Sequence, residues 1–212
     1  MAAQRLDKII ASTGRWSRRE VKDLVRQGRV TVDGVPARSA EEKADPEQAV
    51  IAVNGEKLNW RRYTWVMLNK PAGYLSATED GRGATVLDLL SQDLQRQGLF
   101  PVGRLDKDTE GLLLLTNEGG LAHELLSPKR HVDKEYYVRV TGRLTEADSA
   151  AFAAGLHLDD GLVCQPAELR IMTSGEESEA HVILREGKLP DNLNVHRLWH
   201  FQARCVFFIS CG

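Results

Sequence analysis

Apolar residues recur at helical spacing in two short segments near the start of the chain. The first segment spans residues 4–12. Ser17 opens the second, and Glu20 three residues later completes a capping box, in which the two side chains satisfy backbone N–H groups at a helix start. The pattern therefore predicts two consecutive helices, the second ending near Gly28, a residue type that favours the C-terminal end of a helix.

Two hairpin patterns follow these helices. Residues 30–32 alternate between apolar and polar and run into Asp33-Gly34, and the apolar residues 49–53 run into Asn54-Gly55. Asp-Gly and Asn-Gly are typical of tight hairpin turns, since both residues of such turns take positive φ angles. The first 58 residues thus predict a small helix–helix–hairpin unit.

From residue 59 onward, short strand patterns dominate. Residues 59–62 are expected to link the two regions. Further strands are predicted at 63–68, 112–115, 135–140, 168–172 and 180–185, and helices at 85–90, 121–126 and 145–154. Strands joined by hairpins with occasional helices indicate an α+β domain with a mixed, mostly antiparallel sheet.

Composition narrows the class of protein. With 212 residues, 27% charged and 42% hydrophobic, the chain has the composition of a soluble globular protein with one ordinary domain and one small one. No apolar run approaches the roughly 20 residues of a membrane span, and the start lacks the apolar core of a signal peptide. The three cysteines have no metal-ligand spacing, and their odd number favours reduced thiols in the cytoplasm.

Charge is distributed unevenly along the chain. Residues 1–38 carry nine basic and four acidic side chains, a net +5, which leaves −7 for the rest of a chain whose total is −2. A basic module on an acidic body is typical of a docking surface for a polyanion, and the alternative is a solvated helix face. The candidate RNA-binding residues in this module are Arg5, Lys8, Arg15, Arg18, Arg19, Lys22, Arg26 and Arg29.

The most specific pattern lies between Gly103 and Gly119. It reads GRLDKDTEGLLLLTNEG, a charged loop that enters an apolar strand, and a strand behind a loop is a good way to hold a carboxylate in place. On its own such a loop could be an ordinary turn with solvated charges. The order of residues closely resembles the catalytic motif of the pseudouridine synthases, specifically the RsuA type that modifies bacterial small-subunit ribosomal RNA. The resemblance implies that Asp106 is the catalytic aspartate.

Three other charged residues flank Asp106. Arg104 could pair with Asp106 and lower its pKa, could help displace the target base, or could form a structural ion pair. Asp108 and Glu110 would suit a two-carboxylate glycosidase, but the resemblance carries only the first aspartate as catalytic. Whether Asp106 attacks the sugar or abstracts a proton is left open, because covalent and glycal routes both use an aspartate.

A second motif, Lys134-Glu135-Tyr136-Tyr137, resembles the Lys-x-Tyr motif of the same family. The resemblance implies that Tyr136 stacks on the flipped uracil, since an enzyme acting on a base must take it out of its stack. The alternative is that both tyrosines are ordinary strand aromatics, which is expected of Tyr137. By resemblance, active-site support comes from Asn69, Lys70, Pro71 and Lys134, with Lys70 holding the loop rather than reacting.

The N-terminal region has a resemblance of its own. Residues 4–58, with RLDK at the start and GRVTVDG in the middle, resemble the alpha-L RNA-binding domain of a small-subunit ribosomal protein and many RNA-modifying enzymes. It implies that the basic helix face contacts RNA phosphates, which position RNA without reading its sequence. Lys129 and Arg130, beside His131, form a second basic loop that either contacts RNA or is merely solvated.

The chain departs from the family pattern after Lys188. Family members continue with a His-Gln pair and further basic residues, whereas residues 189–212 do not. We therefore expect an alpha-L domain at 1–58, an incomplete synthase domain at 59–188 and an atypical, aberrant or truncated tail at 189–212. The tail is expected to form neither a regular helix nor a central strand, to leave an unpaired sheet edge, and to allow little or no activity.

Together these observations predict a cytoplasmic, monomeric RNA pseudouridine synthase without metal or cofactor. Its expected partner is small-subunit (16S) ribosomal RNA, either free or in a small-subunit assembly intermediate. Two alternatives stay open: a non-catalytic RNA-binding protein derived from a synthase, and a synthase that acts on large-subunit ribosomal RNA.

Overall fold

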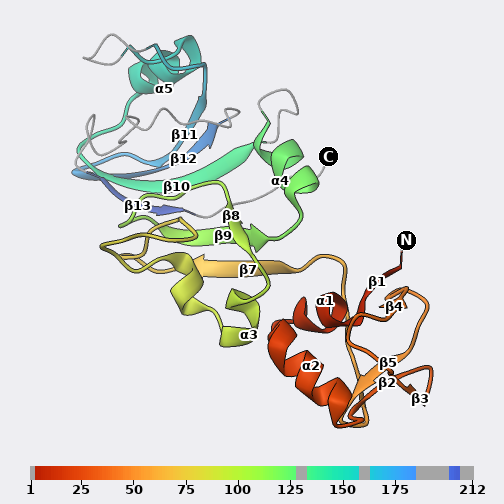
Figure 1. Cartoon of the computed structure of the whole chain (residues 1–212). Coiled ribbons are helices and arrows are strands. Elements are labelled where there is room, and N and C mark those ends of the chain that lie inside the picture. The colour runs from red at the N-terminus through yellow and green to blue at the C-terminus, as the bar shows by residue number, and fades with distance from the viewer. Residues whose placement is uncertain (1–2, 128–132, 158–162, 185–200, 206–212) are drawn as a thin grey trace. The chain divides into compact units, whose positions relative to one another are not determined.

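The computed structural model describes residues 3–127, 133–157, 163–184 and 201–205. The chain divides into two compact units (Figure 1). The N-terminal unit comprises residues 1–64 together with 87–100, and the sheet unit comprises residues 65–86 together with 101–212. Among the described helices, none combines the length and the apolar character that a membrane crossing requires.

Within residues 3–64, the N-terminal unit has two helices beside a four-stranded antiparallel sheet of order β3-β2-β5-β6. Its elements are β1 (Gln4–Arg5), α1 (Leu6–Ala11), α2 (Arg18–Arg26), β2 (Val30–Val32), β3 (Val35–Pro36), β4 (Lys43–Ala44), β5 (Ile51–Val53) and β6 (Glu56–Lys57). Apolar side chains of both helices and of the sheet form one buried core. The predicted helix–helix–hairpin arrangement is confirmed.

Local sequence signals explain the ends of these elements. Ser17 accepts a hydrogen bond from the backbone N–H of Glu20, whose carboxylate accepts one from the backbone N–H of Ser17, so the predicted capping box is present. Asp33 and Asn54 take φ angles of 52° and 56° and are followed by glycines that also have positive φ, as the two hairpin turns require. Gly28 follows the last residues of α2 with a φ of 67°.

A segment distant in sequence, Leu87–Phe100, belongs to the N-terminal unit. It contains most of the 3-10 helix η1 (Val86–Leu89) and the short helix α3 (Gln92–Gln95). Gln97 donates from its side-chain amide to the carbonyl oxygen of Thr13 at 2.9 Å. A Cβ added at Gly14 would lie 1.8 Å from the carbonyl oxygen of Asp93, so only glycine permits this approach.

The sheet unit is built on a seven-stranded sheet. The strand order is β11-β12-β10-β13-β9-β7, with β8 also paired to β9. The strands are β7 (Trp65–Lys70), β8 (Phe100–Val102), β9 (Glu110–Thr116), β10 (Lys134–Thr141), β11 (Glu168–Thr173), β12 (Glu177–Leu184) and β13 (Phe201–Cys205). Along this path every pair is antiparallel except β13 with β9, which confirms the predicted α+β class with a mostly antiparallel sheet.

In the described part of the sheet unit, two α-helices accompany this sheet. Helix α4 (Gly119–Leu126) follows β9, and α5 (Glu146–Ala154) packs over β10, β11 and β12 through Phe152 (Figure 1). The buried core beneath α5 includes Val138, Val140, Ala180 and Val182. Inward-facing residues of β10 and β12 thus alternate with outward-facing polar ones, as expected for a sheet covered on one face.

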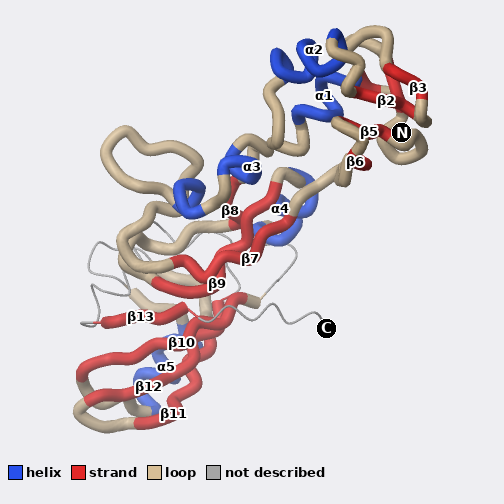
Figure 2. The backbone as a smooth tube through the Cα atoms, turned by 90° about the horizontal axis from the view of Figure 1, so that it is seen from below, coloured by secondary structure: helices blue, strands red, loops and turns tan. Residues whose placement is uncertain are grey.

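The expectation for the tail is wrong in one respect. Residues 201–205 form β13, which lies inside the sheet between β10 and β9 (Figure 2). The departure from the family motif predicts the loss of a strand, but a strand needs only backbone N–H and C=O groups in register with its neighbours. The gap between β10 and β9 is therefore filled, and the end strands of this path are β11 and β7.

Candidate active site and RNA-binding face

Asp106 lies on the loop between β8 and β9. The Asp106 side chain is exposed, whereas Leu105 and Thr109 on either side of it are buried. The backbone N–H of Thr109 donates to the carbonyl oxygen of Asp106 at 3.1 Å, which closes a tight turn. The loop therefore presents the Asp106 carboxylate to solvent, with Asp108 also exposed two residues later, on a backbone that is fixed at both sides.

Lys70, at the end of β7, holds this loop from within. Its side chain is 0% exposed, and Nζ donates to the carbonyl oxygens of Asp106 (2.9 Å), Lys107 (2.9 Å) and Thr109 (2.8 Å), with Pro71 at 3.3 Å. Burial lowers the pKa of Lys70, and nearby carboxylates, led by that of Asp108, oppose the shift. The buried ammonium is thus satisfied by backbone carbonyls. Because its partners are backbone atoms, Lys70 fixes the backbone of the loop and not the side-chain conformation of Asp106.

Two further residues, which the sequence analysis did not single out, support the same loop. Ser76 Oγ donates to the carbonyl oxygen of Leu105 at 2.8 Å and accepts from its backbone N–H at 3.0 Å. The backbone N–H of Gly73 donates to the carbonyl oxygen of Lys107 at 2.8 Å. Serine and glycine in a turn-rich stretch give no sequence signal for this task.

The sheet register relates Tyr136 to the loop. Lys70 lies opposite Gly111, Gly111 opposite Cys205, and Tyr137 opposite Arg204, so Tyr136 is level with Cys205. Residues level with one another on paired strands share a face of the sheet. Tyr136 on β10 and Lys70 beneath the Asp106 loop therefore lie on the same face, with one strand, β13, between β10 and β9.

The other predicted residues around the site vary in burial. Lys134, at the start of β10, is buried, and burial lowers its pKa against the opposing charge of Asp133. Asn69 and Pro71 are exposed on either side of Lys70. Arg104 is exposed on the loop two residues before Asp106.

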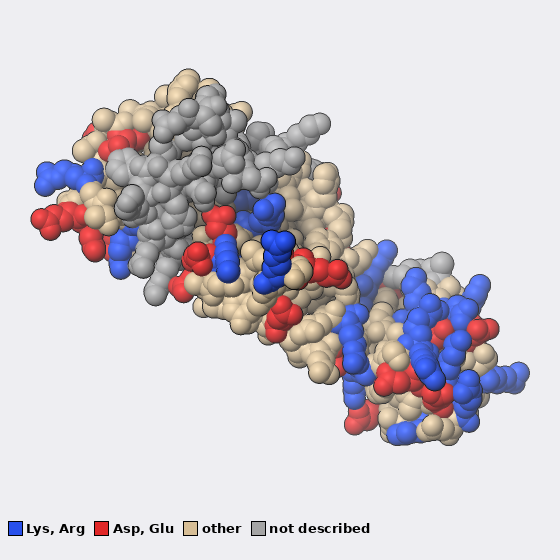
Figure 3. Space-filling model, turned by 60° about the vertical axis from the view of Figure 1, so that its left-hand side comes forward, with Lys and Arg blue, Asp and Glu red and all other residues tan. Residues whose placement is uncertain are grey.

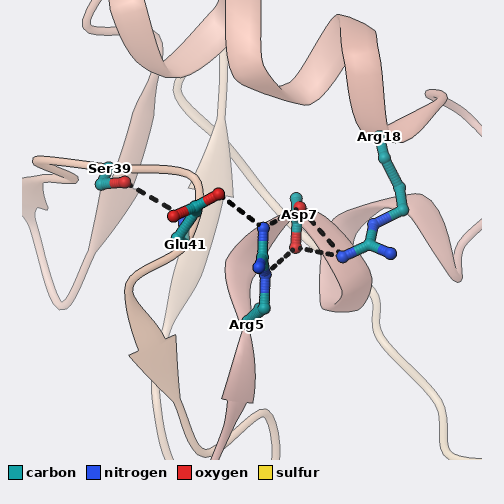
Figure 4. A network of polar contacts seen from close by, with 5 residues as sticks. All are labelled: Arg5, Asp7, Arg18, Ser39 and Glu41. Atoms are coloured by element: carbon teal, nitrogen blue, oxygen red, sulfur yellow. Dashed lines mark hydrogen bonds and ion pairs between the residues drawn. The ribbon is translucent and has the colours of Figure 1, made fainter.

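The basic residues of the N-terminal unit fall into two groups, of which the first surrounds a buried carboxylate. Asp7 on α1 is 1% exposed and accepts hydrogen bonds from Arg5 at 2.9 and 3.1 Å and from Arg18 at 3.0 Å to both oxygens (Figure 4). Burial raises the pKa of Asp7, but these hydrogen bonds and charges outweigh it, so the pKa is lowered. Arg5 also donates to Glu41 at 2.9 Å. Arg5 and Arg18 thus hold the fold together as well as carrying charge.

The second group is more available to RNA. Lys8, Arg19 and Lys22 are exposed, and no described residue forms an ion pair with them. The remaining predicted residues make contacts at the surface. Arg15 lies over the Trp16 ring and 3.5 Å from Glu56. Arg26 forms an ion pair with Asp23, and Arg29 donates a hydrogen bond to Gln27. Lys and Arg side chains crowd this unit in the space-filling view (Figure 3). Lys129 and Arg130 lie outside the described residues.

The fold and the two motifs define a class, an RNA-modifying enzyme with a separate RNA-binding domain. The family model described as "RNA pseudouridylate synthase" matches residues 64–190, and the S4 domain model matches residues 4–50. The chain therefore belongs to the RNA pseudouridylate synthase family and carries an N-terminal S4 domain, the domain that the alpha-L resemblance indicated.

Relatives agree with this assignment. The chain is 45% identical over 185 residues to an uncharacterised RNA pseudouridine synthase of Bacillus subtilis, covering 87% of this chain and 77% of that protein. It is 37% identical over 207 residues to the ribosomal large subunit pseudouridine synthase B of Vibrio vulnificus, covering 94% of this chain and 62% of that protein. A solved pseudouridylate synthase structure covers 97% of this chain and is itself covered to 87%, with a TM-score of 0.58 and 29% identity.

Proposed function

We propose that this chain converts a uridine of ribosomal RNA to pseudouridine, with Asp106 as the catalytic carboxylate. The observation that carries the proposal is the loop itself: an exposed Asp106 stands on a backbone clamped by Lys70, Ser76 and Gly73. Enzymes gain rate by holding reacting groups in one geometry, and a rigidly supported carboxylate meets that need.

The reaction is an isomerisation without net oxidation or reduction. The bond between the ribose carbon and the uracil nitrogen breaks, the base turns, and a new bond forms from the same ribose carbon to a ring carbon. That ring carbon then loses its proton, and the freed nitrogen gains one. Asp106 either attacks the ribose carbon and is displaced when the new carbon–carbon bond forms, or removes a proton from the sugar and returns it after that bond forms, and both routes need it ionised.

Tyr136 serves the base in this proposal. The target uridine must leave its stack to reach Asp106, and an aromatic ring recovers part of that cost, about 1–3 kcal/mol per stacked base. Tyr136 is half-buried on the face that also carries Lys70 and the loop. Arg104, exposed in the same loop, would help displace the base from its helix.

The N-terminal unit docks the RNA. Lys8, Arg19 and Lys22 present charges that no described residue pairs, and Arg5, Arg15, Arg18, Arg26 and Arg29 add to the same field. We further propose that the enzyme acts as a monomer in the cytoplasm. The expected lack of activity rests partly on a missing central strand, and since β13 occupies that position we propose an active enzyme.

Replacing Asp106 with asparagine tests the chemistry. Asp106→Asn keeps the size and exposure of the side chain but removes the charge, so turnover should fall below detection while RNA affinity changes less than about twofold. Tritium release from ribosomal RNA labelled in the uracil ring measures turnover, and filter binding measures affinity. Turnover retained by Asp106→Asn would remove this residue from the mechanism; no turnover by the unaltered chain would favour the alternative of a non-catalytic RNA-binding protein.

We propose further that the ribosomal RNA modified by the enzyme is that of the small subunit. The motif resemblance supports this choice, whereas the named Vibrio relatives are called large-subunit synthases. The 16S and 23S RNAs should be tested separately in the same assay. Each should be offered both as a free transcript and within a partly assembled ribosomal subunit. Tritium release from 16S substrates supports the proposal, and release from 23S substrates alone replaces it with the large-subunit alternative.

A further inference from the structure

A short basic and aromatic connector, Arg61-Arg62-Tyr63, is held at both ends by the N-terminal unit. Before it, the indole N–H of Trp60 donates to Ser12 Oγ at 3.1 Å, and the Trp60 ring packs against the buried core. After it, Thr64 Oγ1 donates to Gln97 Oε1 at 2.7 Å. The three residues are thus a fixed projection of this unit rather than a free linker.

Both arginines of the connector carry unbalanced charge. Arg61 and Arg62 are exposed, and no described acidic residue forms an ion pair with either, in contrast to Arg5 and Arg18, which share Asp7. Adjacent guanidinium groups without carboxylate partners are suited to phosphate oxygens, which they bind through paired N–H donors.

The third residue adds a stacking surface. Tyr63 is 39% exposed, and the Arg62 guanidinium carbon lies 5.2 Å from the centroid of its ring. An exposed tyrosine and a guanidinium plane are the two groups on which proteins stack splayed bases of single-stranded RNA. Bases paired within a duplex keep both faces covered by their neighbours, so such a platform discriminates against duplex RNA.

We propose that Arg61, Arg62 and Tyr63 form a binding site for unpaired nucleotides of the RNA, with the arginines on phosphates and Tyr63 beneath a base. The proposal rests on the proposed function in that RNA is the substrate, but it concerns binding and not the chemistry at Asp106. The site lies outside both sequence motifs and outside the basic helix face.

Binding to an unstructured single-stranded RNA and to a hairpin duplex of equal length provides the test. In the full chain, Tyr63→Leu should weaken single-strand binding about fivefold or more, the loss of one base stack, and leave duplex binding unchanged. Tyr63→Phe should retain affinity because the ring remains. Arg61→Ala with Arg62→Ala should weaken single-strand binding and reduce the slope of log affinity against log salt by about 1.4, since each neutralised phosphate of a single strand contributes about 0.7.

A matched control removes the same charge elsewhere in the unit. Lys43 and Lys57 are exposed on β4 and β6, so Lys43→Ala with Lys57→Ala lowers the net charge equally. The salt slope of this control variant should change by less than half as much as that of Arg61→Ala with Arg62→Ala. Equal changes of slope in the two double variants would overturn the proposed site. So would equal losses of duplex and single-strand affinity in the connector variants, or an unchanged single-strand affinity in Tyr63→Leu.

Turnover of each variant separates this inference from the function on which it rests. Saturating RNA should restore the turnover of Tyr63→Leu, because Tyr63 acts in binding alone. If the unaltered chain releases no tritium but Tyr63→Leu still loses single-strand affinity, the proposed reaction fails and the binding site stands. If turnover is normal and the connector variants bind like the unaltered chain, the site fails and the reaction stands.

Discussion

Asp7 in the N-terminal unit and Lys70 in the sheet unit are both buried charges, yet they are satisfied by different groups. Asp7 is bonded by the guanidinium groups of two partly exposed arginines, so charge balances charge. The Lys70 ammonium donates its hydrogen bonds to backbone carbonyl oxygens, three of them from one loop, which are neutral dipoles. The difference shows what each charge organises: Asp7 orients side chains, whereas Lys70 orients backbone.

This contrast matches the tasks proposed for the two units. RNA docking needs a field of cations, because phosphate contacts position the RNA without reading its sequence. Chemistry needs one carboxylate held within a fraction of an ångström. Lys70, which binds several loop carbonyls, suits the need of catalysis for a fixed carboxylate. Asp7, which orients two arginines, suits the need of RNA docking for several cations.

The largest expected effect comes from Lys70→Met. Methionine fills nearly the same volume but offers no N–H, so the loop carbonyls lose their shared donor and the loop can shift. Because a displacement of about 1 Å can cost about 100-fold in rate, we predict at least that loss of turnover, with RNA affinity unchanged. Tritium release and filter binding measure the two quantities.

Ser76→Ala provides a graded version of the same test. It removes one side-chain group bonded to Leu105 and leaves Lys70 in place, so turnover should fall only about fivefold to tenfold. The thermal unfolding of both variants serves as the control for folding. If Lys70→Met keeps normal turnover with an intact fold, Lys70 does not position the catalytic loop.

For the other buried charge, Asp7→Asn, we predict a loss of stability rather than of chemistry. The free energy of unfolding of the N-terminal unit should fall by about 1–3 kcal/mol, the cost of poorly satisfied buried groups, because the half-exposed arginines can rehydrate. The lowered pKa of Asp7 means that its contribution is complete above the ordinary carboxyl value near pH 4 and is lost as pH falls through the lower folded value. Denaturant unfolding should therefore show that the unaltered protein is more stable than Asp7→Asn at neutral pH and that this difference disappears in strong acid. A difference in the free energy of unfolding that does not depend on pH would assign the loss to packing instead of charge.

The smallest effect separates paired from unpaired cations. Arg19→Ala with Lys22→Ala should reduce the salt slope of RNA binding by about 0.7–0.9 for each phosphate that the variant no longer neutralises. Arg18→Ala should reduce it by less per residue, because Arg18 is already shared with Asp7, but should lower the melting temperature. Equal slopes per residue in the two variants would mean that the Asp7 network does not withdraw Arg18 from RNA.

Sequence predicted those parts of the fold whose causes are local. The capping box of Ser17 and Glu20 and the Asp-Gly and Asn-Gly turns each act over a few residues, so their outcome could be derived without knowledge of the rest. The loop that carries Asp106 could be located because its residues are contiguous. Its support by Ser76 could not, since a serine in a turn has many possible partners.

Features that depend on distant partners escaped prediction. The close approach of Gly14 to Asp93 joins segments far apart in the chain, and neither segment signals the other. In the sequence Asp7 is one acid in a basic region, although its burial between Arg5 and Arg18 makes it a structural centre. Strand β13 is short and follows residues that depart from the family motif, so its place in the sheet came from pairing with β10 and β9 alone.

The place of β13 also sets an order of assembly. Residues 134–184 contain the whole antiparallel ladder β10-β12-β11, and residues 65–116 contain the pair β7-β9, so both can form from nearby segments as the chain leaves the ribosome. They become one sheet only when residues 201–205 enter between them, with Cys205 meeting Gly111 across a long stretch of chain. A nascent chain that stops short of this strand would carry Asp106 and Tyr136 on two separate ladders. Because long-range pairings form slowly, we expect the joining of the two ladders to be a slow step of folding.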